Sequence, residues 1–178
     1  MIASKVAHSA LAGRFTARGW RGGAFAAAGL VAAAFVPASA AQQREISNDV
    51  DACRSGSGPA LLVNVTGIKA SSGKMRIQTY RATREEWMEK GKWISRIETA
   101  AKAGTMTFCL PVPDTGTYGV AVRHDVNGNG KTDLGQDGGG ISNNPSINIF
   151  NLGKPSYTKV GVGVGREVKS ISIQMKYL

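Results

Sequence analysis

The sequence predicts an all-β fold, an antiparallel β-sandwich of about seven short strands with one short connector helix. Short runs alternate apolar and polar residues, as in Lys74 to Arg81 and Thr117 to His124. Clusters of Gly, Pro, Asn and Ser separate these runs. A helix-start pattern stands out at one place, and no strand–helix repeat of a barrel or dinucleotide-binding fold is visible.

The front of the chain, residues 1–40, has the composition of a secretory signal peptide. Four basic and no acidic side chains precede an Ala-rich apolar run, and Ala38-Ser39-Ala40 supplies a cleavage site. The apolar run is shorter than the about 20 residues of a membrane span. We therefore expect an exported protein, periplasmic or extracellular, that begins at Ala41 and has no transmembrane span after cleavage.

The first half of the domain contains two strands and the connector helix. Residues 41–59 are polar and are expected to form a tail or linker, and the sandwich domain is expected over residues 60–178. Strands are predicted for Ala60 to Thr66 and Lys74 to Arg81. Thr83 and Glu86 form a capping box, which predicts a helix from Thr83 to Lys90 with Trp87 and Met88 covering one end of the core.

The second half contains further strands around one long loop. Strands are predicted for Trp93 to Thr99, Thr105 to Leu110 and Thr117 to His124, and a closing hairpin for Tyr157 to Val164 with Glu167 to Leu178. The buried face of the last strand should hold Ile171, Ile173, Met175 and Tyr177. The spacing Asp114-x-Gly116-x-Tyr118 is similar to the tyrosine corner of immunoglobulin-like sandwiches. Residues 125–157 form a loop region long enough to be functional.

Two cysteines, Cys53 and Cys109, lie in the predicted exported part. An even number of cysteines in an exported protein favours a disulfide bond, and the alternative is two unpaired thiols. The bridge would close a loop of more than fifty residues. A chain-entropy argument gives such a bridge about 4 kcal/mol of stability.

The loop after the strand ending at His124 carries the most specific pattern. Asp125, Asn127 and Asn129 alternate, a glycine follows, and Asp133 comes at the ninth position, as in calcium-binding loops. The twelfth position is not a glutamate, and Asp137 is the candidate substitute. The sequence therefore predicts a weak calcium site, with a dissociation constant on the order of 10⁻⁴–10⁻³ M. The alternative is a metal-free loop of Asx turns.

Charge and motifs limit the other functions. The formal net charge is +10, but Lys and Arg are scattered, so solvated strand faces explain them and no specific nucleic-acid partner is expected. An anionic glycan or lipid bound without metal is one alternative. His124 stands beside Asp125, but neighbours on a strand point to opposite faces. No catalytic motif is present, so a carbohydrate-active enzyme using Asp125, Asp133 or Asp137 is the weaker alternative.

The chain also resembles a known family. The run from Thr117 to Asp133, the motif Ser142-Asn143-Asn144-Pro145 and the closing strand resemble the bacterial exported domain-of-unknown-function family numbered 2141. The resemblance covers roughly residues 60–178. It implies one transthyretin-like or immunoglobulin-like sandwich in the bacterial envelope and implies no activity. We therefore predict an exported module that has a binding or structural role, with an envelope partner or glycan and an oligomeric state that the sequence leaves open.

Overall fold

The computed structural model describes residues 43–54, 56–146 and 153–177. Every described residue belongs to one compact unit, Ala38–Leu178. The predicted signal peptide therefore lies outside the described residues. Within the described ranges, no helix has the length and apolar character needed to cross a membrane.

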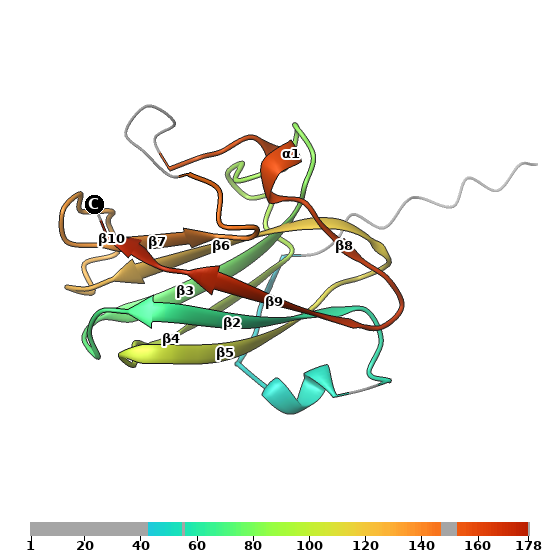
Figure 1. Cartoon of the computed structure of the whole chain (residues 1–178), viewed down its shortest axis with the longest axis horizontal. Helices are drawn as coiled ribbons and strands as arrows, with labels where there is room; N and C mark the ends of the chain where they lie inside the picture. The colour runs from blue at the N-terminus through green and yellow to red at the C-terminus, as the bar shows by residue number, and fades with distance from the viewer. Residues whose placement is uncertain (1–42, 55, 147–152, 178) are drawn as a thin grey trace, which may run out of the picture. The chain divides into compact units, whose positions relative to one another are not determined.

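This unit is built from short strands and two very short helices (Figure 1). The elements, in chain order, are β1 (Arg44–Glu45), η1 (Val50–Cys53), β2 (Ala60–Ile68), β3 (Lys74–Arg81), β4 (Ser95–Ala100), β5 (Gly104–Pro111), β6 (Gly116–Asp125), β7 (Gly138–Ile141), α1 (Tyr157–Val160), β8 (Val162–Val164), β9 (Val168–Gln174) and β10 (Lys176–Tyr177). Here η1 is a 3₁₀ helix.

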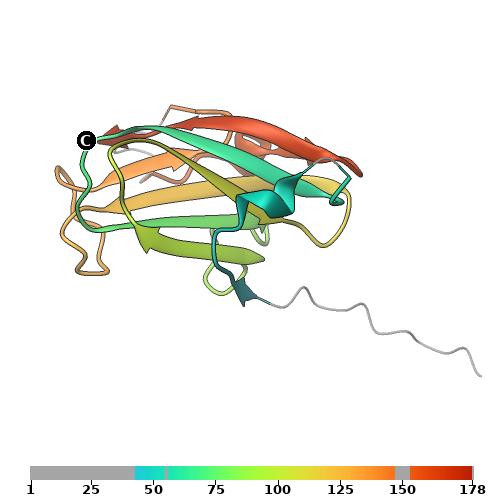
Figure 2. The same cartoon turned by 90° about the horizontal axis from the view of Figure 1, so that it is seen from below.

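The strands form two sheets that face each other (Figure 2). The large sheet has the order β1-β4-β3-β6-β7-β10, with β8 also paired to β6, and the small sheet has the order β5-β2-β9. Alternate side chains of both sheets fill one apolar core. Its fully buried members include Leu61, Val63, Val65, Met75, Ile77, Ile97, Phe108, Leu110, Tyr118, Val120 and Ile173. The predicted sandwich is confirmed.

The predicted C-terminal hairpin is wrong. Residues 157–160 form α1, β8 pairs with β6 in the large sheet, and β9 pairs with β2 in the small sheet. The link that looked like a hairpin turn therefore carries the chain from one sheet to the other. The β2–β9 pair is parallel, as is β1–β4, whereas the other pairs are antiparallel. As predicted, Ile173 and Met175 are buried, and Ile171 and Tyr177 are half-buried against the core.

The predicted connector helix is also wrong, because residues 84–88 form turns. One backbone bond has helical spacing, from Trp87 N to Thr83 O at 3.0 Å, and Met88 then takes a positive φ of 53°. Such a backbone cannot continue a right-handed helix. Burial of Trp87, which is 2% exposed, overrides the local helix signal at Thr83 and Glu86.

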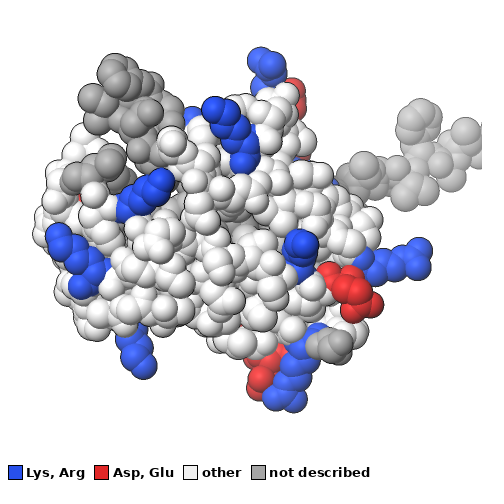
Figure 3. Space-filling view, viewed as in Figure 1, with Lys and Arg blue, Asp and Glu red and all other residues white. Residues whose placement is uncertain are grey.

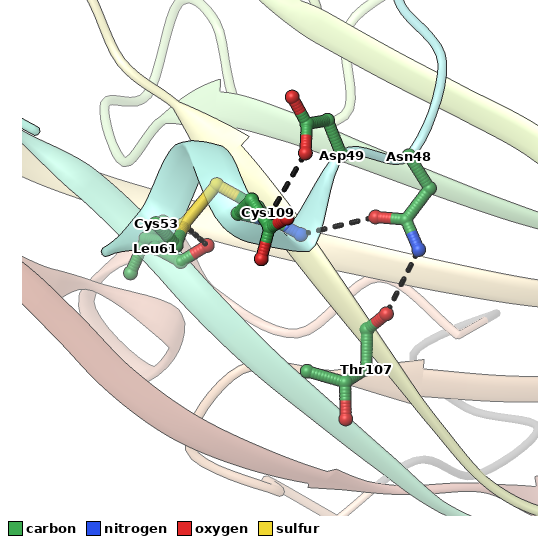
Figure 4. The surroundings of a disulfide bond; sticks show 7 residues. Asn48, Asp49, Cys53, Leu61, Thr107 and Cys109 are labelled. Carbon is green, nitrogen blue, oxygen red and sulfur yellow. Dashed lines mark hydrogen bonds between the residues drawn. A yellow bond between two sulfur atoms is a disulfide. The ribbon is translucent and has the colours of Figure 1, made fainter.

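The segment predicted as a tail or linker packs on the sandwich. Strand β1 pairs with β4, and the disulfide between Cys53 and Cys109 ties η1 to the small sheet, with a Cα–Cα distance of 5.6 Å (Figure 4). The predicted pairing of the cysteines is confirmed. Beside it, the Asn48 amide donates to Thr107 O at 2.9 Å and accepts from Cys109 N at 3.2 Å. A side chain thus bonds the outer edge of β5 as a neighbouring strand would.

An asparagine side chain also bonds the opposite edge of the small sheet. The Asn144 amide donates to Ser172 O at 3.0 Å, and its oxygen accepts from Gln174 N at 2.7 Å. Both edge strands of the small sheet, β5 and β9, therefore bond an asparagine side chain. Asn144 has a φ of 49°, a left-handed conformation that asparagine tolerates better than most residues.

The tyrosine corner is present. The Tyr118 hydroxyl is fully buried and lies 2.9 Å from the backbone oxygen of Asp114 and 2.7 Å from its Oδ1. Arg81 binds the other carboxylate oxygen at 2.7 Å. Burial, and then the bond to Asp114, raise the pKa of Tyr118 to about 12. This corner fixes the turn before β6, the strand that leads to residues 125–137.

Candidate functional site

The Asp/Asn loop, residues 125–137, begins at the end of β6 and is organised by Asp125. Its Oδ1 accepts from Asn129 N at 3.1 Å, and its Oδ2 accepts from Gly130 N at 2.8 Å. The Arg123 guanidinium lies 3.3 Å from the same Oδ2. Gly130 has a φ of 79°, so the tight return of the chain suits a residue without Cβ. Asp125 is 3% exposed and is balanced by these three donors.

Asp137 closes the loop from its other end. Its Oδ1 accepts from Val126 N and its Oδ2 from Asp133 N, both at 3.0 Å. Asp137 is 8% exposed, and the two bonds clamp the first and last turns of the loop together. The residue that sequence reasoning named as a substitute metal ligand therefore holds the loop backbone.

The two asparagines form Asx turns. The side-chain oxygens of Asn127 and Asn129 accept from the backbone N–H groups two residues further on, at 3.0 and 2.7 Å. Their amide nitrogens both donate to Asp133 Oδ2, at 2.8 and 2.7 Å. These two bonds hold the pKa of Asp133 below its ordinary value.

This arrangement does not fit a cation. The oxygens of Asn127 and Asn129 face backbone N–H groups, and nitrogens instead of oxygens converge on Asp133. Across the described part of the chain, no group of three or more His, Cys, Asp or Glu side chains could hold a metal. The structure has the hydrogen bonds of the Asx-turn alternative. Calcium binding stays a prediction. It requires the side-chain amides of Asn127 and Asn129 to rotate so that their oxygens face the ion.

His124 points into the sandwich, away from Asp125, and is fully buried. Its Nδ1 lies 2.7 Å from the Tyr177 hydroxyl and its Nε2 lies 2.8 Å from Ser72 O. A carbonyl can only accept, so Nε2 donates to Ser72 O. The tyrosine oxygen in turn accepts from Lys69 N at 2.9 Å. His124 therefore links two loop ends and is not placed to act with Asp125.

A hollow of about 400 Å³ lies beside the loop, on the outward face of the large sheet. Residues that pair directly across β3, β6, β7 and β10 run along its floor in the order Arg76, Arg123, Gly139, Lys176. Paired residues point to the same face of a sheet. We call these four residues the cationic row, in which one glycine interrupts three basic side chains.

A second row lies one step along the strands, and it is less polar. Gln78 pairs with Ala121, which pairs with Ile141. Beyond it, Tyr80 pairs with Gly119, and the Trp87 ring packs on that glycine so closely that a Cβ there would lie 2.5 Å from the ring. Glycine is required at this contact.

The two ends of the hollow are formed by different parts of the molecule. At one end, Tyr80, Trp87, Ile141 and Val160 form a buried apolar cluster, which we call the apolar cap. The Tyr80 and Trp87 rings meet edge to face at 5.6 Å, and Trp87 Nε1 donates to Pro155 O at 2.9 Å. At the other end stands the Asp/Asn loop, with Leu134 81% exposed at the rim.

The floor is open because of Gly139. A Cβ built at Gly139 meets no atom within 4 Å, whereas one at Gly138 or Gly140 would strike Tyr177 or Ile173 on the core side. The middle glycine therefore leaves space where a side chain would stand, and the outer two allow β7 to lie close to the core.

Sequence reasoning missed this hollow. It placed the three glycines in a loop, but they form β7. A usable signal was present in β3, where Arg76, Gln78 and Tyr80 alternate with the core residues Met75, Ile77 and Thr79. Tyr80, at the end of this outward face, is buried, so other segments must pack over it. The residues that do so, Ile141 and Val160 among them, are distant in sequence.

The motif Ser142-Asn143-Asn144-Pro145 after β7 links β6 to α1. Ser142 Oγ accepts from Val120 N at 3.0 Å and donates to Val160 O at 2.7 Å. Asn143 Nδ2 donates to Gly161 O at 3.0 Å. These bonds hold α1 against β6, so the motif supports the apolar cap.

These observations define the class as a β-sandwich that carries a disulfide and has a hollow on the outward face of its large sheet. The chain belongs to the family described as "Uncharacterized protein conserved in bacteria (DUF2141)", whose model matches residues 63–172. The resemblance seen in the sequence is confirmed. No curated protein and no solved structure matches the chain.

Proposed function

We propose that this protein is an exported binding module of the bacterial envelope and that its ligand occupies the hollow on the large sheet. The observation that carries the proposal is the open floor at Gly139, between the apolar cap and the Asp/Asn loop. The volume of about 400 Å³ lies within the range of small-molecule sites. Export is supported by the signal-like residues 1–40 and by a disulfide, which persists in oxidising compartments.

The test is a substitution that fills the hollow. Gly139→Leu adds a side chain into open space, and Gly163→Leu, on β8 outside the hollow, is the matched control because its Cβ also meets nothing. Compounds from a small-molecule library that bind wild type should shift the amide NMR signals of Ala121 and Ile141. Gly139→Leu should lose these shifts and the control should keep them. A library hit that binds both variants equally, or the absence of any hit, would overturn the proposal.

Calcium binding at Asp125, Asn127, Asn129, Asp133 and Asp137 is a separate candidate. It is supported by the sequence spacing, while the hydrogen bonds of the loop favour a metal-free state. If calcium binds, its role is structural, because it would stiffen one wall of the hollow. Melting curves with calcium and with EDTA test it.

The two alternatives have less support. On the face seen in Figure 3, Lys and Arg stand singly or in small groups, so that face has no continuous basic patch for a glycan or lipid held by charge alone. For a carbohydrate-active enzyme, Asp133 and Asp137 do line the hollow. Both, however, accept hydrogen bonds from their own loop, and Asp137 uses both oxygens in doing so.

A further inference from the structure

The cationic row contains an unfavourable contact. Arg76 and Arg123 pair directly across β3 and β6, and like charges directly opposite each other destabilise a sheet. Each has an acidic partner, which for Arg76 is on the neighbouring strand β4 and for Arg123 is two residues further along β6. Glu98 lies 2.6 Å from Arg76 Nε, and Asp125 lies 3.3 Å from Arg123. Neither carboxylate lies between the two basic residues in the pairing order.

The row also has unused donors. Arg123 Nε is buried and has no hydrogen-bond partner in the described part of the chain. A guanidinium has five N–H groups, and those of Arg123 that are bonded go to Gly130, Thr132 and Asp125 at 3.2 to 3.5 Å, which is long for a charged group. Lys176 makes one long bond, 3.4 Å, to Pro145 O.

Two acidic side chains, Asp133 and Asp137, also line the hollow, against three basic ones. Asp137 accepts two backbone N–H groups, and Asp133 accepts two amides. Neighbouring strands lie about 4.8 Å apart, so Arg123 and Lys176 start about 10 Å apart with Gly139 between them. That gap is open, flanked by two cations, and wide enough for one carboxylate or phosphate group.

Away from the cationic row and the Asp/Asn loop, the lining of the hollow is mostly apolar, with Gln78 as a polar exception. From the cationic row towards the apolar cap, the lining changes to Ala121 and Ile141 and then to Tyr80 and Met88. A ligand lying along the strands would therefore meet positive charge at one end and carbon at the other. A water-soluble sugar or a bare inorganic anion would leave the apolar part unfilled.

We propose that the ligand is an amphipathic anion, such as a fatty acid, whose acidic head lies over Gly139 among Arg76, Arg123 and Lys176 and whose apolar body lies towards Tyr80 and Met88. This inference rests on the proposed function and adds the ligand class to it. The same chemistry is offered by a free acyl acid and by an anionic lipid of a membrane.

Titration calorimetry of the protein expressed from the full chain tests the class, with dodecanoate and uncharged dodecanol as probes. Wild type should bind one dodecanoate per chain, and dodecanol at least about tenfold more weakly, since a charge-assisted contact is worth more than 1.4 kcal/mol. Arg76→Gln should weaken the binding of dodecanoate and leave the binding of dodecanol unchanged. This variant leaves Glu98 a second partner, Arg96, at 3.8 Å, so the sheet should keep its stability. Lys74→Gln, outside the hollow, is the matched control.

The outcomes separate the two proposals. Equal binding of dodecanoate and dodecanol, both lost in Gly139→Leu, would overturn the anion while keeping the hollow as a ligand site. Binding of either probe that Gly139→Leu leaves intact would overturn both. Phosphatidylglycerol vesicles distinguish the sources: sedimentation with vesicles that Gly139→Leu abolishes identifies a membrane lipid, and its absence alongside dodecanoate binding identifies a free acid. Vesicle binding alone, unaffected by Gly139→Leu, would overturn the inference.

Discussion

The two ends of the hollow are closed in opposite ways. The apolar cap joins Tyr80, Trp87, Ile141 and Val160, which are far apart in sequence, through ring packing and burial. The Asp/Asn loop is closed within residues 123–137 by hydrogen bonds to carboxylates. The first kind of closure depends on the whole sandwich, whereas the second depends on local spacing. A change at the cap should therefore unfold the domain more readily, and a change in the loop should act mostly on the loop.

The largest effect is expected at the cap. Trp87→Ala removes a buried indole and its bond to Pro155, and should lower the free energy of unfolding by about 3–5 kcal/mol. Urea unfolding measures this loss. Trp93→Ala is the milder comparison, because Trp93 packs at the edge of the same cluster, is only half-buried and stacks on Arg96 at 4.4 Å. Equal losses in the two variants would show that the full burial of Trp87 adds no stability.

The next effect is expected at the loop clamp. Asp137→Asn puts an NH₂ group against one of two backbone N–H donors and should cost about 1–3 kcal/mol. The same change at Asp51, whose side chain is 74% exposed in a surface pair, should cost almost nothing. Hydrogen exchange should speed up between Val126 and Asp133 in the first variant. Unchanged exchange there would contradict the clamp.

Calcium should have a smaller effect if it binds. At about ten times a dissociation constant of 10⁻⁴–10⁻³ M, mass action adds roughly 1.4 kcal/mol, and the melting temperature should rise by a few degrees. EDTA should reverse the rise. Asp125→Ala is a poor control, because Asp125 also holds the N–H groups of Asn129 and Gly130. If wild type melts at the same temperature in millimolar calcium and in EDTA, the prediction of a calcium site in the loop is wrong.

The smallest effect is a pH dependence confined to the loop. The pKa of Asp133 is lowered by bonds from Asn127 and Asn129, so this contribution is present above the unfolded pKa of about 3.9 and is lost as the pH falls through the lower folded value. NMR signals of residues 127–131 should change below about pH 4 while the Trp87 indole signal stays constant. Asp133→Asn should remove the dependence. If the Trp87 indole signal changed at a higher pH than the signals of residues 127–131, the comparison between the apolar cap and the loop would be wrong.

What could be predicted from the sequence follows the same division. The strand Lys74–Arg81 was predicted to the residue, because alternation is a local pattern. The tyrosine corner and the disulfide also rest on short motifs or on the small number of cysteines. The strands after Pro155 were predicted as a hairpin, because nothing local shows that the chain changes sheets there.

The site shows this limit most clearly. The loop residues were identified as a group, and the structure brings them together, but it assigns their oxygens to N–H groups. The hollow depends on pairing between β3, β6, β7 and β10, and on the absence of a side chain at Gly139. Strand register is set by contacts across the sheet, so single-sequence patterns could not reveal that Arg76, Arg123 and Lys176 share one row.

The asparagine side chains on the edges of the small sheet have a further consequence. Unpaired edge strands are templates on which other chains add strands and aggregate. Asn48 and Asn144 bond the outer backbone groups of β5 and β9, so at these positions a strand from another molecule would first have to displace an amide that makes two bonds. Such protection matters for any chain that folds among copies of itself. Each molecule can finish its own sheet without being extended by its neighbours.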